Sequence, residues 1–176
     1  MKIYSNRKGF TLLEVVAVLV IMGIITAVAL SRLVSNQNNL IATTDILTSH
    51  LRLAQARAMN TSADNVTTFS VWGISFSSST QYYFFNCPNA SACTPATNQV
   101  TLLGADSRII MDLAPKGVQV TNGTPLVLAF DRFGTPYTDA TLTTSLAAQL
   151  TLTLKDNKGN TKTINITPQT GMIIKG

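Results

Sequence analysis

Charge is scarce in this 176-residue chain, and one long run lacks it entirely. Charged residues make up 12% of the sequence, and none occurs from Val15 to Leu30. The net charge is +5, but three basic residues, Lys2, Arg7 and Lys8, fall in the first nine positions. The remaining 10 basic and 8 acidic residues leave a net charge of +2. Such a balance argues against a large nucleic-acid footprint, which needs a dense basic stripe.

Residues that commonly carry catalysis or bind metals are also few. His50 is the single histidine, and its position beside Leu51 in a helical segment is typical of a packed or surface residue. Cys87 and Cys93 have no second histidine to complete a zinc site. The sequence shows neither a nucleophile-elbow serine nor a glycine-rich phosphate loop. We therefore expect a protein without enzyme activity, cofactor or metal.

The two cysteines lie in the segment CPNASAC, with five residues between them. This spacing differs from the C-x-x-C pattern of zinc knuckles and redox sites. If this part of the chain faces an oxidising compartment, we expect a short disulfide-closed loop between Cys87 and Cys93. Closing such a loop stabilises a fold by about 2–3 kcal/mol. Two free buried thiols are the alternative.

The uncharged run is long enough to cross a membrane. With Phe10–Leu13 and Ser31 it reaches the roughly 20 residues that a bilayer-spanning helix needs. The basic residues lie on its N-terminal side, so the positive-inside rule predicts residues 1–9 in the cytoplasm and residues after about 32 outside. An ordinary signal peptide is an alternative, because AVA at Ala27–Ala29 is a small-residue cleavage site that would release a chain beginning at Leu30.

The helix is predicted to continue beyond this run. Neither glycine nor proline occurs between Gly23 and Gly73, and apolar or small residues recur at helical spacing after residue 39. These residues are Leu40, Thr44, Leu47, Leu51, Ala54 and Ala58. The segment NTSADN (Asn60–Asn65) predicts the end of the helix. We expect one helix from about Phe10 to Asn60, with its later part packed on a soluble domain.

After residue 65 the pattern changes to that of short strands. QLTLTLK alternates leucine and threonine, DNKGN predicts a turn, and TKTINIT returns with Ile164 and Ile166 facing inward. The residues around Gly159 faintly resemble a Ca²⁺ loop, but the twelve-residue pattern with its glutamate is absent, which favours a hairpin turn. Gly73 interrupts another strand and is a candidate position for a β-bulge. These strands predict one antiparallel β domain.

The N-terminal segment RKGFTLLEV resembles the leader and cleavage motif of type IV prepilins and type II secretion pseudopilins. The match runs from Lys8 to about Leu30 and combines a short basic leader, Gly9, Phe10, Glu14 and the apolar helix. The resemblance implies that a prepilin peptidase cuts between Gly9 and Phe10 and that the new Phe10 amine is N-methylated. It also implies that Glu14 pairs with the Phe10 amine of an adjacent subunit as helices stack. A carboxylate in an apolar span is tolerated when it has such a cationic partner.

The resemblance also implies a pilin-like α+β fold, with a long N-terminal helix packed on a C-terminal antiparallel β-sandwich. The expected organisation is a cytoplasmic leader at 1–9, a transmembrane half-helix at 10–31, a periplasmic half-helix at 32–62 and a β-rich domain at 63–176. Before assembly such a chain is a single-pass protein of the inner membrane, with prepilin peptidase and other pilins or pseudopilins as partners. Many members have a proline where this chain has Ser31. Without that proline, Gly23 is the residue expected to destabilise the helix locally, because glycine has a low helix propensity.

A weaker resemblance links the rest of the chain to the H-type minor pseudopilins and FimT-like minor pilins. It rests on FDRFGTPY (Phe130–Tyr137), INITPQTGMI (Ile164–Ile173) and LRLAQARAMN (Leu51–Asn60). The implied function is structural: a minor pilin or pseudopilin that assembles by helix stacking into a type IV pilus or a type II secretion pseudopilus.

Two other functions remain open. A DNA-binding minor pilin of a DNA-uptake system would use the basic residues of the predicted hairpin, Lys155, Lys158 and Lys162. The near-neutral body of the chain makes nucleic acid the less favoured partner. An exported soluble protein would use the apolar segment as an ordinary signal peptide, which leaves the carboxylate of Glu14, directly before the uncharged run, unexplained.

Overall fold

The computed structural model describes residues 11–60, 70–101, 110–122 and 126–176. The chain divides into two compact units, Met1–Ser35 and Asn36–Gly176, which we call the first and the second unit. One long helix, α1 (Leu12–Met59), contributes to both units.

In the first unit, α1 exposes its apolar side chains. Every residue from Thr11 to Ala29 is exposed, and the stretch Leu12–Ala29 has a mean hydropathy of 2.7. By length and composition this stretch could cross a membrane. The hydroxyl of Thr26 donates to the Met22 carbonyl at 2.8 Å, which satisfies a polar group in an otherwise apolar segment.

In the second unit, α1 carries the predicted stripe into the core. Each stripe residue is at most 2% exposed: Leu40, Thr44, Leu47, Leu51, Ala54 and Ala58. The hydroxyls of Thr44 and Thr48 donate to the backbone carbonyls one turn earlier, so these buried polar groups are satisfied. The helix ends at Met59. The predicted stripe and the predicted helix end are therefore confirmed.

Two antiparallel sheets make up most of the rest of the second unit. The six-stranded sheet has the order β3-β2-β1-β6-β7, and β4 also pairs with β2. Its strands are β1 (Val71–Phe76), β2 (Gln81–Cys87), β3 (Gln99–Val100), β4 (Ile110–Asp112), β6 (Leu126–Phe130) and β7 (Pro136–Tyr137). The four-stranded sheet has the order β10-β9-β8-β5. Its strands are β5 (Val118–Val120), β8 (Leu150–Asp156), β9 (Thr161–Ile166) and β10 (Ile173–Lys175). Two short 3-10 helices, η1 (Ala90–Ala92) and η2 (Ala114–Lys116), lie in connecting segments.

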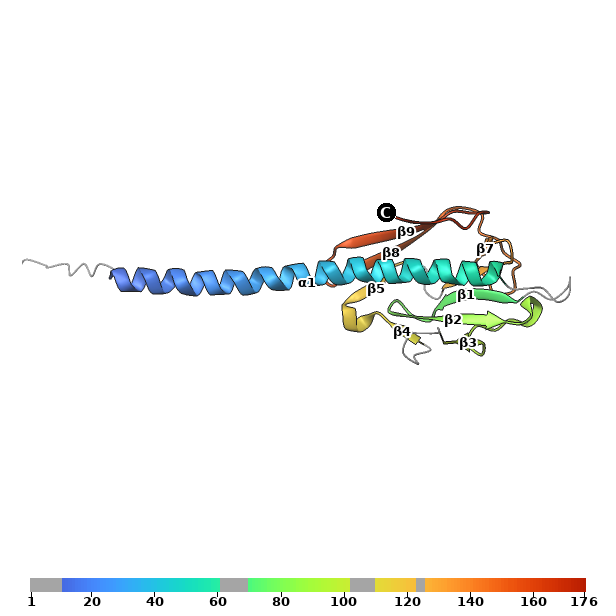
Figure 1. The fold of residues 1–176 in the computed structure, drawn as a ribbon, viewed down its shortest axis with the longest axis horizontal. Coiled ribbons are helices and arrows are strands. Elements are labelled where there is room, and N and C mark those ends of the chain that lie inside the picture. The colour runs from blue at the N-terminus through green and yellow to red at the C-terminus, as the bar shows by residue number, and fades with distance from the viewer. Residues whose placement is uncertain (1–10, 61–69, 102–109, 123–125) are drawn as a thin grey trace, which may run out of the picture. The chain divides into compact units, whose positions relative to one another are not determined.

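The later part of α1 contacts both sheets. The His50 ring lies edge-on to Tyr82 and Phe84 of β2, and Arg52 Nη2 donates to the Ile173 carbonyl of β10 at 2.9 Å. Buried side chains of α1 and of both sheets form one core. Figure 1 shows this part of α1 between β8–β9 and β1–β2. The predicted α+β fold, with a long N-terminal helix and antiparallel sheets, is confirmed.

The six-stranded sheet is also covered on its other face. A second cluster there includes Phe85, Cys87, Cys93 and Ala140, which follows from the alternation of side chains along β1, β2 and β6. Cys87 and Cys93 form a disulfide that closes the loop carrying η1. Of the two expected states, the structure therefore shows the bridged one.

The predicted hairpin is formed by β8 and β9. Its register pairs Leu152 with Ile164 and Leu150 with Ile166. The side chains of Leu152, Leu154, Ile164 and Ile166 are fully buried. The alternation of leucine and threonine therefore separates an inward and an outward face, as the sequence predicts.

The bulge expected at Gly73 is wrong. β1 pairs without interruption, and Gly73 lies opposite Phe85 on β2 and Ala129 on β6. A Cβ at Gly73 would lie 2.5 Å from Phe85 Cζ and 2.5 Å from the Leu128 carbonyl oxygen. The glycine therefore makes room for the Phe85 ring and for a neighbouring strand, and the register does not shift.

We expect Gly73→Ala to lower the free energy of unfolding by about 1–3 kcal/mol, because the added methyl group overpacks the sheet. Urea unfolding of the full chain in detergent, followed by the fluorescence of Trp72, measures the change. Gln119→Ala on the exposed side of β5 is the control, with an expected change within about 0.5 kcal/mol. Equal stability of Gly73→Ala and the wild type would contradict the close packing.

Candidate functional site

Glu14 lies in the first turn of α1, three residues after Thr11. Thr11 Oγ1 accepts a hydrogen bond from the Glu14 N–H at 3.3 Å, so Thr11 caps the helix. A carboxylate in the first turn is also favoured by the positive end of the helix dipole. The Thr-x-x-Glu spacing is that of a capping box, a sequence signal that is easily overlooked beside the cleavage motif.

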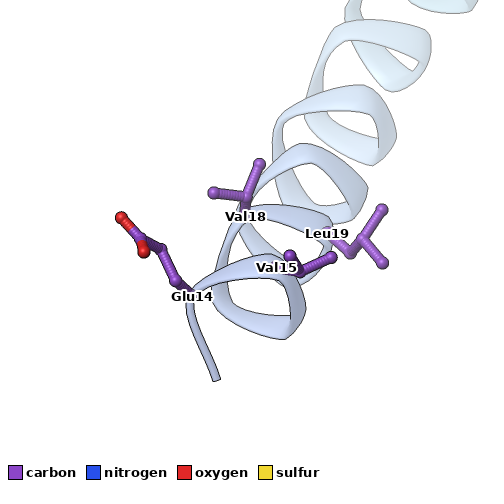
Figure 2. Close-up of a pocket in the computed structure, with 4 residues that line it drawn as sticks. All are labelled: Glu14, Val15, Val18 and Leu19. Atoms are coloured by element: carbon purple, nitrogen blue, oxygen red, sulfur yellow. The ribbon is translucent and has the colours of Figure 1, made fainter. Parts of the chain in front are cut away.

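The surroundings of Glu14 are apolar. Figure 2 shows its carboxylate projecting away from the helix. Glu14, Val15, Val18 and Leu19 line a shallow surface hollow. All four side chains are exposed. No other charged residue occurs at positions 11–29. A carboxylate in such a segment costs free energy in lipid unless a cation lies beside it.

The predicted cleavage and methylation residues, Gly9 and Phe10, lie outside the described part of the chain. Their roles stay predictions, as does the pairing of Glu14 with the Phe10 amine of another subunit. The structure does describe the Glu14 side chain, which is exposed, close to the start of the helix and on an apolar surface.

A family model described as the prokaryotic N-terminal methylation motif matches residues 4–30. The match supports a type IV pilin-like protein. The matched segment contains Gly9, Phe10 and Glu14, and it implies processing by prepilin peptidase and assembly with other pilins. Together with the apolar helix, it fits a membrane-anchored protein of a family that is generally structural. Neither a search of curated proteins nor a search of solved structures gives a significant match.

Three segments far apart in the sequence meet beside the end of α1. Gln55 Nε2 donates to the Gly134 carbonyl at 3.0 Å and to the Thr170 carbonyl at 3.2 Å. Gly171 has a φ of +62°, and a Cβ there would collide with the Gly134 carbonyl oxygen. The three segments that carry the weaker resemblance are therefore held together around one glutamine.

The three lysines of the hairpin do not share a face of the sheet. Lys162 pairs with Leu154, which is buried, whereas Lys155 pairs with Thr161 one position along the ladder. Successive residues of a strand point to opposite faces, so Lys155 and Lys162 flank the hairpin from opposite sides. Lys158 lies in the turn between the strands. The structure brings these lysines to one end of the hairpin without forming a basic face, and their contact with DNA stays a prediction.

Asp156 organises that turn. Its carboxylate accepts hydrogen bonds from the Lys158 N–H at 2.9 Å, the Asn160 N–H at 2.8 Å and the Asn160 side-chain amide at 2.8 Å. The amide of Asn160, followed by these backbone donors, lowers the pKa of Asp156 although burial opposes the shift. The carboxylate is therefore used by the turn itself, which supports the hairpin interpretation over a Ca²⁺ loop. Among the described residues, no group of three His, Cys, Asp or Glu side chains could hold a metal.

His50 is a packed residue. Its Nδ1 lies 2.8 Å from the hydroxyl oxygen of Tyr82. Burial lowers the pKa of His50, and the positive charge of Lys116 lowers it further. Burial also raises the pKa of Tyr82, so both groups are neutral near pH 7. Of the two expected placements, packed or at the surface, the structure shows the packed one. The sequence carries no signal for its partner Tyr82.

We expect acid to destabilise Asp156→Asn less than it destabilises the wild type. Because the folded pKa lies below the ordinary value of 3.8, the ionised carboxylate stabilises the fold above that value. This contribution is lost as the pH falls through the folded pKa. The measurement is the free energy of unfolding of both proteins from neutral pH down to about pH 2. An acid dependence as steep in the variant as in the wild type would contradict the assigned role.

Proposed function

We propose that this chain is a minor pilin or pseudopilin subunit. Prepilin peptidase cuts it between Gly9 and Phe10, and the Phe10 amine is methylated. The mature chain is anchored in the inner membrane by the first part of α1, with the second unit in the periplasm. It then assembles by helix stacking into a type IV pilus or a type II secretion pseudopilus.

The observation that carries this proposal is the single carboxylate of Glu14 on the apolar first part of α1, where every residue from Leu12 to Ala29 is exposed. A helix of this kind is stable in lipid or among other apolar helices. Glu14 needs a cation in either environment, since breaking a buried ion pair costs about 3–5 kcal/mol. The amine of Phe10 on a neighbouring subunit supplies that cation, so pairing favours assembly and fixes the register between helices.

The finer assignment to the H-type minor pseudopilins is supported by the contacts of Gln55. The two C-terminal segments of that resemblance are joined to the helical one through the carbonyls of Gly134 and Thr170. Short motifs that meet in space are stronger support than the same motifs spread along a sequence. A minor subunit is therefore favoured over the shaft-forming major pilin.

The experiment that tests processing is the mass of the mature N-terminal peptide from cells that contain a prepilin peptidase. The expected peptide begins with methylated Phe10. A peptide that begins at Leu30 would show cleavage by signal peptidase, and the chain would then be an exported soluble protein. A peptide that retains Met1 would show that the motif is not processed.

We expect Glu14→Ala to remain in the membrane and to enter filaments at least about tenfold less well than the wild type, because the neighbour's amine loses its partner. The measurement is the ratio of filament-bound to membrane-bound protein in the same cells. Val18→Ala is the matched control, since it truncates a neighbouring side chain of the same surface without removing charge. Normal incorporation of Glu14→Ala would disprove the pairing.

A further inference from the structure

The lysines of the second unit gather at one of its ends. The sequence of this unit contains five lysines, and the structure describes all of them. They are Lys116, Lys155, Lys158, Lys162 and Lys175. We call the surface that they form the lysine end. Four of them are exposed, and Lys155 is partly exposed.

Contacts between elements show that these lysines are neighbours. The Asn157 N–H donates to the Gly117 carbonyl at 3.2 Å, which places the β8–β9 turn beside η2 and Lys116. Lys175 pairs with Ile164 on β9, two residues from Lys162. Residues of α1, β9 and β10 line one groove of about 140 Å³, namely Ile41, Thr44, Asp45, Lys162, Lys175 and Gly176.

The lysine end is the end at which α1 enters the second unit. Two contacts show how β9 runs along the helix. Arg52 binds the carbonyl of Ile173, which pairs with Ile166 of β9. Asp45 binds Lys175, which pairs with Ile164 of β9. The residues of β9 nearest the β8–β9 turn therefore lie beside the residues of α1 nearest Asn36. Figure 1 shows the start of β9 and the segment before β5 at this same end.

The arginines of the second unit are placed differently. Each described arginine of this unit has a protein partner. Arg52 donates to a β10 carbonyl at 2.9 Å. Arg57 lies 5.5 Å from the centre of the Trp72 ring, and Arg132 lies 4.8 Å from the centre of the Phe133 ring. Arginine suits such planar contacts, whereas lysine is a compact, strongly hydrated charge. Because the described arginines make contacts with other residues of this unit, the lysine end is a surface distinct from them.

The lysine end also carries more positive than negative charge. Among the described residues, the acidic side chains near this end are Asp45, Asp112 and Asp156, three against five lysines. Asp156 is occupied by hydrogen bonds of the turn, and Asp45 neutralises Lys175 at 2.5 Å. The other lysines give this end a net positive charge that an anionic surface can match.

Few residues separate the second unit from the apolar stretch of the first. The apolar stretch ends at Ala29, and the second unit begins seven residues later at Asn36. These seven residues belong to α1 and rise about 10 Å along the helix. The polar headgroup layer adds about 5–7 Å beyond the hydrocarbon. A surface near Asn36 is therefore within reach of lipid headgroups in an anchored chain.

We infer that the lysine end rests on anionic phospholipid headgroups while the chain is anchored in the membrane. The inference depends on the membrane anchoring in the proposed function and adds a second contact to it. The attraction acts within about a Debye length, close to 8 Å at physiological salt. Each lysine near an anionic surface contributes about fivefold to the binding equilibrium. Nucleic acid is the less favoured partner, because the lysines surround an end tethered to lipid and do not form a stripe along one face.

The test is amine footprinting of the full chain in vesicles, read by mass spectrometry at each lysine. One set of vesicles is phosphatidylcholine, and the other contains about one third phosphatidylglycerol. We expect the lysines of the lysine end to be acylated about fivefold more slowly in the anionic vesicles, and salt at about 0.5 M to remove the difference. Flotation with the vesicles establishes separately that the chain is anchored in both.

A variant with Lys155→Gln, Lys158→Gln and Lys162→Gln tests whether protection of the remaining lysines depends on the charge of the hairpin lysines. Lys116 and Lys175 should lose most of their protection in this variant. The matched control carries Arg57→Gln and Arg132→Gln, which remove positive charge elsewhere in the second unit, and it should keep the protection of the wild type.

Equal acylation in both vesicles, in a chain that floats with them, would overturn the lipid contact and leave the anchoring intact. Protection in both vesicles that salt does not change would also overturn it, because a protein–protein contact would then cover the lysines. Protection by added duplex DNA alone would assign the surface to nucleic acid instead. A chain that does not float would overturn the anchoring and this inference together.

Discussion

The buried stripe of α1 from Leu40 to Ala58 is the contact on which the rest of the second unit depends. The β8–β9 hairpin is apolar on one side only, and an isolated hairpin has little stability in water. The six-stranded sheet presents Ile74 and Phe84 to the same core. One helix therefore covers both sheets. Its small residues Ala54 and Ala58, fully buried, allow close approach where larger side chains would hold the sheets apart.

Periodic features of this fold can be predicted from sequence, because they repeat within one element. The stripe of α1 and the alternation of β8 and β9 are of this kind, and the structure confirms both. Gly73 shows the limit. A glycine within a strand is compatible with a bulge or with a closely approaching neighbour, and only the position of the Phe85 ring decides between them.

Contacts between distant segments are not encoded in any local pattern. In the sequence, Gln55 is indistinguishable from any polar residue of a helix. In the structure, its side-chain amide donates hydrogen bonds to carbonyls 79 and 115 residues away. The pairing of His50 with Tyr82 is similar, since it depends on where β2 meets α1. Sequence also suggested one basic cluster on the hairpin. The register places Lys155 and Lys162 on opposite faces of the hairpin. The fold brings Lys116 of η2 and Lys175 of β10 to the same end of the second unit.

The two charged features of the proposed subunit differ in the medium that surrounds them. Glu14 would act in hydrocarbon or between helices, where the low dielectric makes an unpaired charge costly and salt has little access. The lysine end would act in water at the headgroup surface, where each attraction is modest and screened by salt. A subunit that leaves the membrane can therefore release its lysine contacts one at a time, at small cost each. In the proposed subunit, the charge of Glu14 would need a cation before the helix leaves the lipid, because a lone charge is costly in a low dielectric. Pairing at Glu14 would then be the step that commits the helix to assembly.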